Sequence, residues 1–182
     1  MEGAPGRTWY IPHHGVCHPK KNILRVFFDC GAVYQGTSLN SELFQGRDLT
    51  NSLVGVLLRF RREPVALMAD IRSMSHQVRV SKSDIDFLRF IWWRDGDIEQ
   101  DPIDHRMLVH LFGAVSSPTC ASFALRRTAE DNQHARTQVT DTIMHNFYVD
   151  DCLTSLPTVQ DAVQLTADLT ELCNKGGFQL TK

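Results

Sequence analysis

The sequence predicts an α+β fold in which antiparallel hairpins pack against amphipathic helices, and three stretches support this fold class. Residues 147–153 place two adjacent aspartates between apolar residues of high strand propensity, which is typical of a tight β-hairpin with carboxylates at its turn. Residues 65–69 form an apolar run of strand length that ends at Asp70. Residues 158–175 carry leucines at helical spacing, and two glycines follow them.

The adjacent aspartates, Asp150 and Asp151, point to a bound cation. Two like charges a few ångströms apart repel each other, and the repulsion grows as water is excluded. Hard divalent ions such as Mg²⁺ offset it, because they bind through one or two carboxylates together with substrate phosphates. A solvated Asp-Asp turn is the alternative interpretation, since turns favour aspartate.

Length and composition limit the number of domains and the class of protein. The chain has 182 residues, 42% of them hydrophobic and 22% charged, which suits one sizeable core rather than several domains. No apolar run reaches the length of a membrane span, and the first residues do not form a signal peptide. The five cysteines include no C-x-x-C pair, which favours reduced thiols in an intracellular protein.

The charges are unevenly distributed along the chain. Residues 1–62 contain eight Lys or Arg and four Asp or Glu, a net of +4, whereas residues 63–182 contain eleven and seventeen, a net of −6. A basic N-terminal part and an acidic remainder would suit a polyanion and metal ions, respectively.

Two strands and a helix are expected in the first part of the chain. The strand candidates are residues 9–12 and 24–28, separated by a loop whose paired lysines would either hold phosphates or be solvated. Residues 47–62 have the spacing of an amphipathic helix, with Asp48 or Thr50 as its cap. The apolar run that follows is expected to be a buried central strand, which would fix the aspartate at its end in position.

The middle of the chain is expected to contain a second hairpin and a helix. Residues 87–93 and 106–112 are its strand candidates, with a turn at residues 94–97. A Ser-Ser-Pro sequence then opens a helix over residues 117–131, and residues 132–142 are expected to form a polar loop. Another strand begins after the two glycines that end the last helix.

Together these motifs resemble the palm motifs of reverse transcriptases, and among them the polymerase region of BEL/Pao-type LTR retrotransposons. The resemblance covers about residues 9–182. Its most specific piece is Tyr-Val-Asp-Asp at residues 148–151, and residues 111–118 and 14–21 are similar to this retrotransposon branch in particular.

The resemblance implies a right-hand polymerase made of fingers and palm, with an antiparallel palm sheet packed on helices and no thumb. The fingers would comprise about residues 8–64 and 81–112, and the palm about residues 65–80 and 113–182, within one domain. The implied activity is that of an RNA-directed DNA polymerase, a nucleotidyltransferase. Its partners would be an RNA or DNA template with a primer and deoxynucleoside triphosphates.

The resemblance also implies a catalytic site. Asp70, Asp150 and Asp151 would hold two Mg²⁺ ions, or Mn²⁺ in their place, and the backbone carbonyl of Ile71 would complete a coordination sphere. Such a pair of ions assists an in-line displacement by the primer 3′-hydroxyl. The other implied contacts are Lys20, Lys21 and Arg25 at the phosphates, Ser75 at the sugar, Gly113 at the nucleotide and template, Tyr148 and Val149 at the primer end, and Lys182 as the general acid.

Three departures from the family pattern bear on activity. Ser75 stands where these enzymes carry an aromatic gate against the ribose 2′-hydroxyl, so poor sugar discrimination is expected. Arg72 places a cation near Asp70, where the family usually has an acidic residue. The chain stops before any thumb, RNase H or integrase region, so we expect either a slice of a longer polyprotein or a truncated, decayed copy.

Two further functions are consistent with the sequence. One is a catalytically silent remnant that only binds nucleic acid through its basic fingers, in a salt-sensitive manner. The other is a zinc-dependent module, although adjacent ligands on one short loop rarely close a tetrahedral site. The zinc ligands would be His13, His14, Cys17 and His18. If the chain is a retrotransposon polymerase, its expected location is the cytoplasm or a retrotransposon particle.

Overall fold

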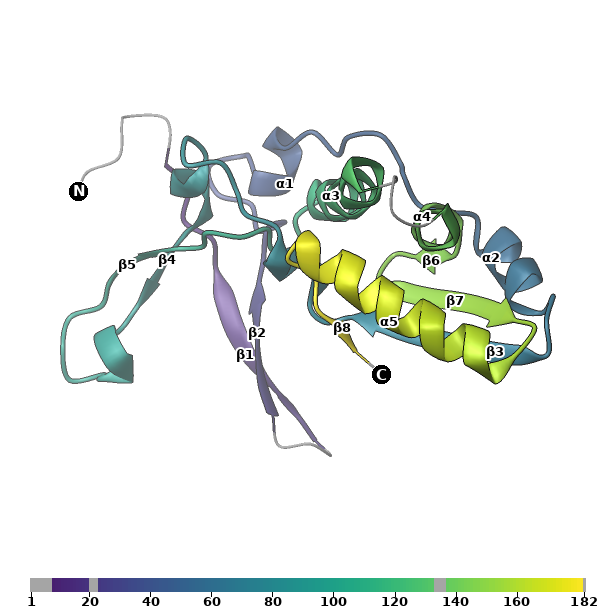
Figure 1. The fold of residues 1–182 in the computed structure, drawn as a ribbon. Coiled ribbons are helices and arrows are strands. Elements are labelled where there is room, and N and C mark those ends of the chain that lie inside the picture. Colours follow the sequence, from purple (N-terminus) through teal and green to yellow (C-terminus); the bar gives the residue numbers. More distant parts are fainter. Residues whose placement is uncertain (1–7, 20–22, 133–136, 182) are drawn as a thin grey trace. The chain divides into compact units, whose positions relative to one another are not determined.

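The structure, a computed structural model, describes residues 8–19, 23–132 and 137–181 (Figure 1). It confirms an α+β fold with antiparallel sheets. In chain order the elements are β1 (His13–His18), β2 (Ile23–Phe28), α1 (Leu39–Glu42), α2 (Leu53–Phe60), β3 (Val65–Ile71), the 3₁₀ helices η1 (Met74–Gln77) and η2 (Ile85–Leu88), β4 (Arg89–Trp92), η3 (Arg94–Gly96), β5 (Ile103–Arg106), α3 (Ser117–Asp131), α4 (Thr137–His145), β6 (Phe147–Tyr148), β7 (Asp151–Leu156), α5 (Val159–Lys175) and β8 (Leu180–Thr181).

The chain folds into two units, each made of two segments. The first unit comprises Met1–Gln45 and Arg79–Ser117, and the second comprises Gly46–Val78 and Pro118–Lys182. Helix α2 therefore groups with the second unit, where it contacts β6 and β7. In the expected division into fingers and palm, this stretch is part of residues 8–64 of the fingers.

The first unit contains two hairpins, and in each of them one strand lies where it was predicted and the other does not. Strand β1 pairs with β2, so the strand expected at residues 9–12 instead begins at His13. Strand β4 pairs with β5 over Ile103–Arg106, and the prediction of a strand at residues 106–112 is wrong. In both cases strand propensity pointed to the more apolar neighbour, whereas side-chain contacts across the hairpin select the register.

A buried arginine explains the register of the second hairpin. The Arg89 side chain is 3% exposed and forms ion pairs with Asp86 at 2.9 Å and Asp104 at 3.0 Å. The Tyr10 hydroxyl donates to the same Asp104 carboxylate at 2.9 Å, and Arg106 lies 3.2 Å from Asp86. Because a buried charge is tolerated only when it is paired, this network favours the register that brings Asp104 to Arg89.

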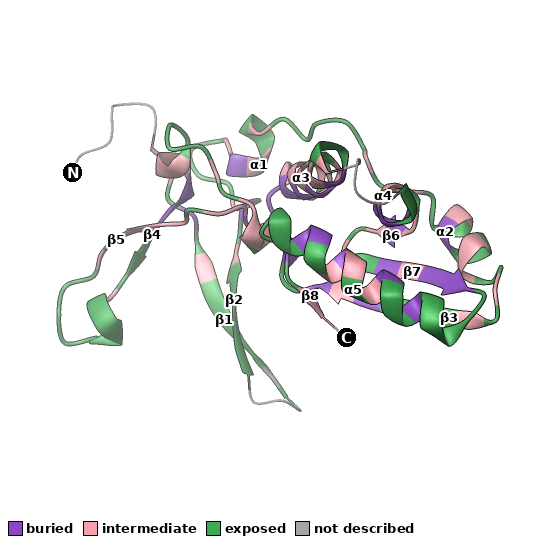
Figure 2. Ribbon diagram, in the orientation of Figure 1, coloured by how far each residue is buried: buried purple, intermediate pink, exposed green. Residues whose placement is uncertain are grey.

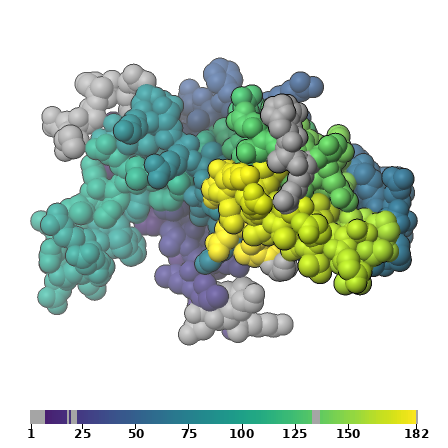
Figure 3. All heavy atoms as spheres, viewed as in Figure 1, coloured from purple at the N-terminus to yellow at the C-terminus, as the bar shows by residue number. Residues whose placement is uncertain are grey.

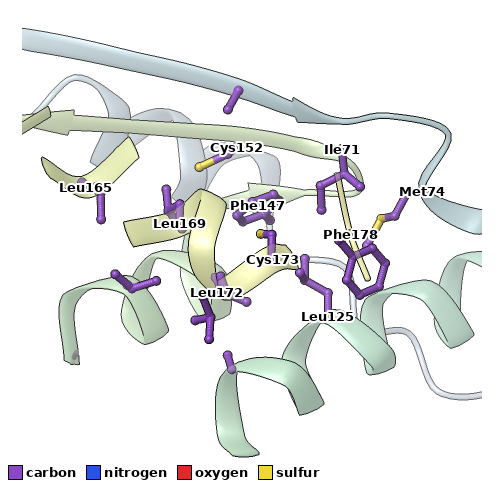
Figure 4. Packing of buried hydrophobic residues seen from close by; sticks show 14 of the residues in the cluster. Ile71, Met74, Leu125, Phe147, Cys152, Leu165, Leu169, Leu172, Cys173 and Phe178 are labelled. Carbon is purple, nitrogen blue, oxygen red and sulfur yellow. The ribbon is translucent and has the colours of Figure 1, made fainter. Parts of the chain in front are cut away.

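The second unit is built on a sheet of strand order β6-β7-β3-β8, with neighbouring strands antiparallel. Helix α5 lies along this sheet, and its buried positions alternate with exposed ones (Figures 1 and 2). Its outer side is exposed at the molecular surface (Figure 3). The buried leucines of α5 join residues of β3, β6, β7, α3 and α4 in the core shown in Figure 4.

Strand β3 is central in this sheet, as predicted, but it is buried on one face only. Ala69 and Ile71 are buried, whereas Met68 is 58% exposed. The alternation arises because successive side chains of a strand point to opposite faces, and the helices cover only one of them. The prediction of a fully buried strand is therefore wrong, and Asp70 lies on the same face as Met68.

Helices α3 and α5 match the predicted ranges, whereas two other predictions need correction. Helix α2 begins after Ser52, not at residue 47, because the Asp48 carboxylate accepts from the Thr50 N–H at 2.8 Å and forms a separate turn. The polar loop predicted for residues 132–142 is wrong from Thr137 onward, where α4 begins and buries Val139, Thr142 and Ile143 on one face. Within the described residues, no helix is long and apolar enough to cross a membrane.

We predict that Gly176→Ala destabilises the second unit. A Cβ at this position would lie 2.7 Å from Thr128 Cγ2, on helix α3, and still closer to its Oγ1. Overpacking of this kind costs about 1–3 kcal/mol of unfolding free energy, measurable by urea denaturation. Adding Thr128→Ala should recover most of the loss. Gly55→Ala, inside α2, is the control, and its unfolding free energy should be the same as that of the wild type or higher. If Gly176→Ala has the unfolding free energy of the wild type, the close contact with Thr128 is refuted.

For the first unit we predict that Asp86→Asn lowers the melting temperature more than Asp104→Asn does. Asp86 accepts two hydrogen bonds from Arg89 and also pairs with Arg106, whereas Asp104 accepts one from Arg89 and one from Tyr10. Asp101→Asn, at an exposed position in the same unit, should leave the melting temperature unchanged. If Asp104→Asn lowered the melting temperature more than Asp86→Asn, the ion-pair network around Arg89 would not be the source of this stability.

Candidate active site

The Tyr-Val-Asp-Asp motif forms the predicted hairpin. Phe147 faces Cys152 and Tyr148 faces Asp151, so Val149 and Asp150 are the two residues of the turn. Val149 has φ +58°, in the left-handed region that a β-branched residue rarely adopts. A positive φ at the first central position is typical of a two-residue hairpin turn that matches the twist of its strands.

The pairing of β3 with β7 brings two of the three predicted aspartates opposite each other. Asp70 faces Asp151 across the strand pair, and on its other side it faces Thr181 of β8. The Ile71 N–H donates to the Asp150 carbonyl at 3.0 Å, so the turn is also held against the end of β3. Residues directly opposite in an antiparallel pair have Cβ atoms about 4.5–5.5 Å apart, and like charges there are unfavourable.

This arrangement offers oxygen donors at the open face of the sheet. Asp70 and Asp150 are half-buried and Asp151 is exposed, so water and substrate can reach them. Among the described residues, no three His, Cys, Asp or Glu side chains are gathered into a group that could hold a metal ion. Mg²⁺ does not require such a group, since it usually binds through one or two carboxylates with water and substrate phosphates. The donor chemistry of the facing pair fits that mode.

Cys152 follows directly after Asp151 but belongs to the core. Burial, with smaller contributions from Cys173 and Asp151, raises the pKa of the Cys152 thiol to about 12. A thiol that stays protonated is neither a nucleophile nor a metal ligand at neutral pH. The polar chemistry at this end of β7 therefore comes from the carboxylates.

Polar side chains that no sequence pattern indicated hold the hairpin along the edge of β6. Asn51 Nδ2 donates to the Phe147 carbonyl at 2.8 Å. This bond satisfies a backbone group on the outer edge of β6, which is the last strand of the sheet. Arg126 donates to the Asn51 side-chain oxygen at 3.2 Å and to the Leu49 carbonyl at 2.9 Å. Asn51 and Phe147 are distant in sequence, so no local pattern could have revealed this support.

The segment after β3 contains Ser75, the residue predicted to lie at the sugar of the nucleotide. Ser73 has φ +46°, Met74 is buried in the core, and Ser75 is half-buried within η1. Arg72 is exposed, and its N–H donates to the Gln179 carbonyl at 3.0 Å. Ser75 thus follows Asp70 on a short, compact turn of the same unit.

The remaining predicted contacts lie in the first unit or outside the described residues. Arg25 is exposed on β2. Gly113 has φ +102°, a conformation that favours glycine, and a Cβ there would lie 3.4 Å from the Phe28 carbonyl. Its own carbonyl accepts from Asn40 Nδ2 at 3.0 Å. The positions of the predicted contacts Lys20, Lys21 and Lys182 lie outside the described residues.

The predicted zinc ligands His13 and His14 do not meet at one site, and the side chain of His18 lies outside the described part of the structure. The His13 ring packs 5.4 Å from the rings of Phe90 and Trp92, whereas the His14 ring stacks on Phe27 at 6.1 Å. Neighbouring residues of a strand point to opposite faces, so these two side chains cannot share one ion. Within the described part of the chain no metal-binding group involves them.

No protein-family model and no curated protein matches the chain. Solved structures do match. A foamy viral protease-reverse transcriptase in complex with an RNA/DNA hybrid is 16% identical, with a TM-score of 0.66 over 96% of this chain and 20% of that one. The chain has a reverse-transcriptase-like fold.

Two more structures with this fold are similar to the chain. A foamy viral protease-reverse transcriptase in complex with double-stranded DNA has a TM-score of 0.67 and 15% identity, over 94% of this chain and 26% of that one. The native protease-reverse transcriptase of prototype foamy virus has a TM-score of 0.66 and 14% identity, over 94% and 20%. The chain thus spans a fifth to a quarter of the length of these proteins.

The strained turn yields a stability prediction. Val149→Gly should raise the unfolding free energy of the second unit by about 1 kcal/mol, because glycine adopts a positive φ without the steric cost that valine pays. Val163→Gly, at an exposed position within α5, is the control and should lower it. A loss of stability in Val149→Gly, measured by denaturant titration, would contradict a strained turn.

Proposed function

We propose that the chain is the fingers and palm of an RNA-directed DNA polymerase. The observation that carries this proposal is the pairing of Asp70 with Asp151 beside the Tyr-Val-Asp-Asp turn, within a reverse-transcriptase-like fold. We further propose that it belongs to the BEL/Pao branch of retrotransposons, on the basis of residues 111–118 and 14–21.

In this proposal Asp70, Asp150 and Asp151 hold two Mg²⁺ ions, with the Ile71 carbonyl as a further ligand. When bound, such ions stabilise the attacking and leaving oxygens of the in-line displacement. The role of the protein would be positional: the β3–β7 pairing holds Asp70 opposite Asp151 on the open face, and Asp150 would contribute the third carboxylate from the turn. Tyr148 and the exposed Val149 would contact the primer end.

The partners follow from the same assignment. Two of the similar structures contain an RNA/DNA hybrid or double-stranded DNA, which supports a primed template as the nucleic acid bound here. Arg25 on β2, together with Lys20 and Lys21, would neutralise the triphosphate, a task for which a planar guanidinium is suited. Gly113 would allow the nucleotide to approach the backbone closely, and Lys182 would protonate the leaving pyrophosphate.

The direct test is extension of a DNA primer on an RNA template with Mg²⁺ or Mn²⁺. We expect Asp70→Asn, Asp150→Asn and Asp151→Asn each to lower extension by more than about 100-fold, because loss of an outer-shell partner alone costs 10- to 100-fold. Asp141→Asn, an exposed carboxylate on α4, should retain full extension. Chelation of the metal should abolish the signal in every variant.

The same experiment separates the polymerase from a silent nucleic-acid-binding remnant. A remnant would retain primed template on a filter, in a salt-sensitive way, and the aspartate variants would bind it as well as the wild type. Absence of extension by the wild-type chain, or equal extension by wild type and Asp150→Asn, would exclude the polymerase.

Sugar selectivity gives a second prediction. Ser75 leaves space where an aromatic side chain would meet the ribose 2′-hydroxyl, so the wild type should use ribonucleotides and deoxynucleotides with similar kcat/KM. Ser75→Phe should raise the preference for deoxynucleotides by at least about tenfold. The preference is measured by primer extension with ribonucleotides and with deoxynucleotides, supplied in separate reactions. Ser75→Ala keeps the space open and should leave the ratio unchanged. Strong rejection of ribonucleotides by the wild type would refute this role for Ser75.

A further inference from the structure

One side-chain amide closes the turn that follows Asp70. Gln77 Nε2 donates to the backbone carbonyl of Arg72, and Gln77 Oε1 accepts from the Gln179 N–H at 2.7 Å. Both ends of the amide are therefore used by backbone groups of two different segments. One is Arg72, the residue just after β3, and the other is Gln179, the residue just before β8.

These bonds extend the β3–β8 pairing beyond the strands themselves. Strand β8 faces β3 at Asp70 and Ile71, and the Arg72 N–H donates to the Gln179 carbonyl at 3.0 Å. Gln77 then takes both the Arg72 carbonyl and the Gln179 N–H, which a longer strand pair would have satisfied. The backbone from Asp70 to Gln77 is thereby tied into a closed turn.

The turn also has an apolar anchor on its inner side. Met74 and Phe178 are 5% and 1% exposed, and both belong to the core cluster that contains Ile71. Figure 4 shows them with Ile71 at the same end of this cluster. The apolar contacts hold the inner side of the turn. On its outer, polar side, the Gln77 amide adds two hydrogen bonds to the one between the Arg72 N–H and the Gln179 carbonyl.

We propose that Gln77 is a positioning residue that fixes Asp70 and Ser75 relative to each other. This inference rests on the proposed function. Asp70 lies at one end of the closed turn and Ser75 lies within it. Loosening the turn would therefore displace both Asp70, the proposed metal ligand, and Ser75, the residue proposed to lie at the sugar. Gln77 would therefore set the affinity for the divalent cation and the KM for the nucleotide without touching either ligand.

The test compares Gln77→Met with the wild type in the full chain. Methionine has a similar length and retains the apolar stem but can make neither amide bond. We expect the dissociation constant for Mn²⁺, measured by electron paramagnetic resonance without nucleotide, to rise about tenfold, at the lower end of effects from outer-shell residues. The KM for deoxynucleotides should rise more than kcat falls. Gln160→Met, at an exposed position in α5, is the matched control and should change neither value.

Amide hydrogen exchange shows whether the turn has opened in the variant. The Gln179 amide should exchange faster in Gln77→Met than in the wild type, while the melting temperature stays close to that of the control. Faster exchange with unchanged Mn²⁺ affinity and KM would overturn the inference and leave Gln77 a purely structural residue. Unchanged exchange would overturn it as well, since the amide would then not hold the turn.

The outcomes for the inference and for the proposed function are distinct. If the wild type binds Mn²⁺ but extends no primer, the proposed function fails, and a weaker Mn²⁺ affinity of Gln77→Met still supports the positioning role. If the wild type extends primers and Gln77→Met matches it in Mn²⁺ affinity and KM, only the inference fails. Absence of Mn²⁺ binding by the wild type would overturn both.

Discussion

The antiparallel pairing of β3 with β7 is the constraint on which the site depends. Its register sets Ala69 opposite Cys152 on the covered face, where both are buried beneath the helices. The next pair along the strands, on the open face, is Asp70 with Asp151. A slip of one residue would expose the apolar side chains and bury the carboxylates, so the core itself enforces the juxtaposition of two negative charges.

The supports around this pair occupy different sides of it. Asn51, itself hydrogen-bonded to Arg126, caps the outer edge of β6 and so holds the hairpin that carries Asp150 and Asp151. Gln77 ties the exit of β3 to β8 on the other side. The strained Val149 lies at the tip of the same hairpin. Strain at such a position persists only where the surrounding contacts determine the backbone, which is the situation here.

The sequence predicted what local patterns encode. Apolar spacing, turn residues and caps are enough to predict the hairpin at residues 147–153, the central strand that carries Asp70, and the helices α3 and α5. The pairing of Asp70 with Asp151 was anticipated only through the resemblance to reverse transcriptases, because two strands so far apart in the chain carry no local signal of their register.

The errors arose where distant contacts outweighed local propensity. Strand β5 pairs where Asp104 can reach the buried Arg89, not where the chain is most apolar. Helix α4 forms in a polar stretch because one narrow face of it is buried. The polar supports were missed for a related reason, since Gln77 and Asn51 bond to backbone groups about a hundred residues away. An ordinary amide side chain gives no indication in the sequence of such a partner.

Asp70 and Asp151 face each other as a like-charge pair, and we propose that a divalent cation stabilises this pair. The most direct measurement is the melting temperature of the wild type and of Asp151→Asn, each with and without Mg²⁺. Without Mg²⁺ the variant should melt at a higher temperature, because one of two repelling charges is gone. Saturating Mg²⁺ should raise the melting temperature of the wild type and not that of the variant. Equal responses of the two proteins to Mg²⁺ would contradict the account.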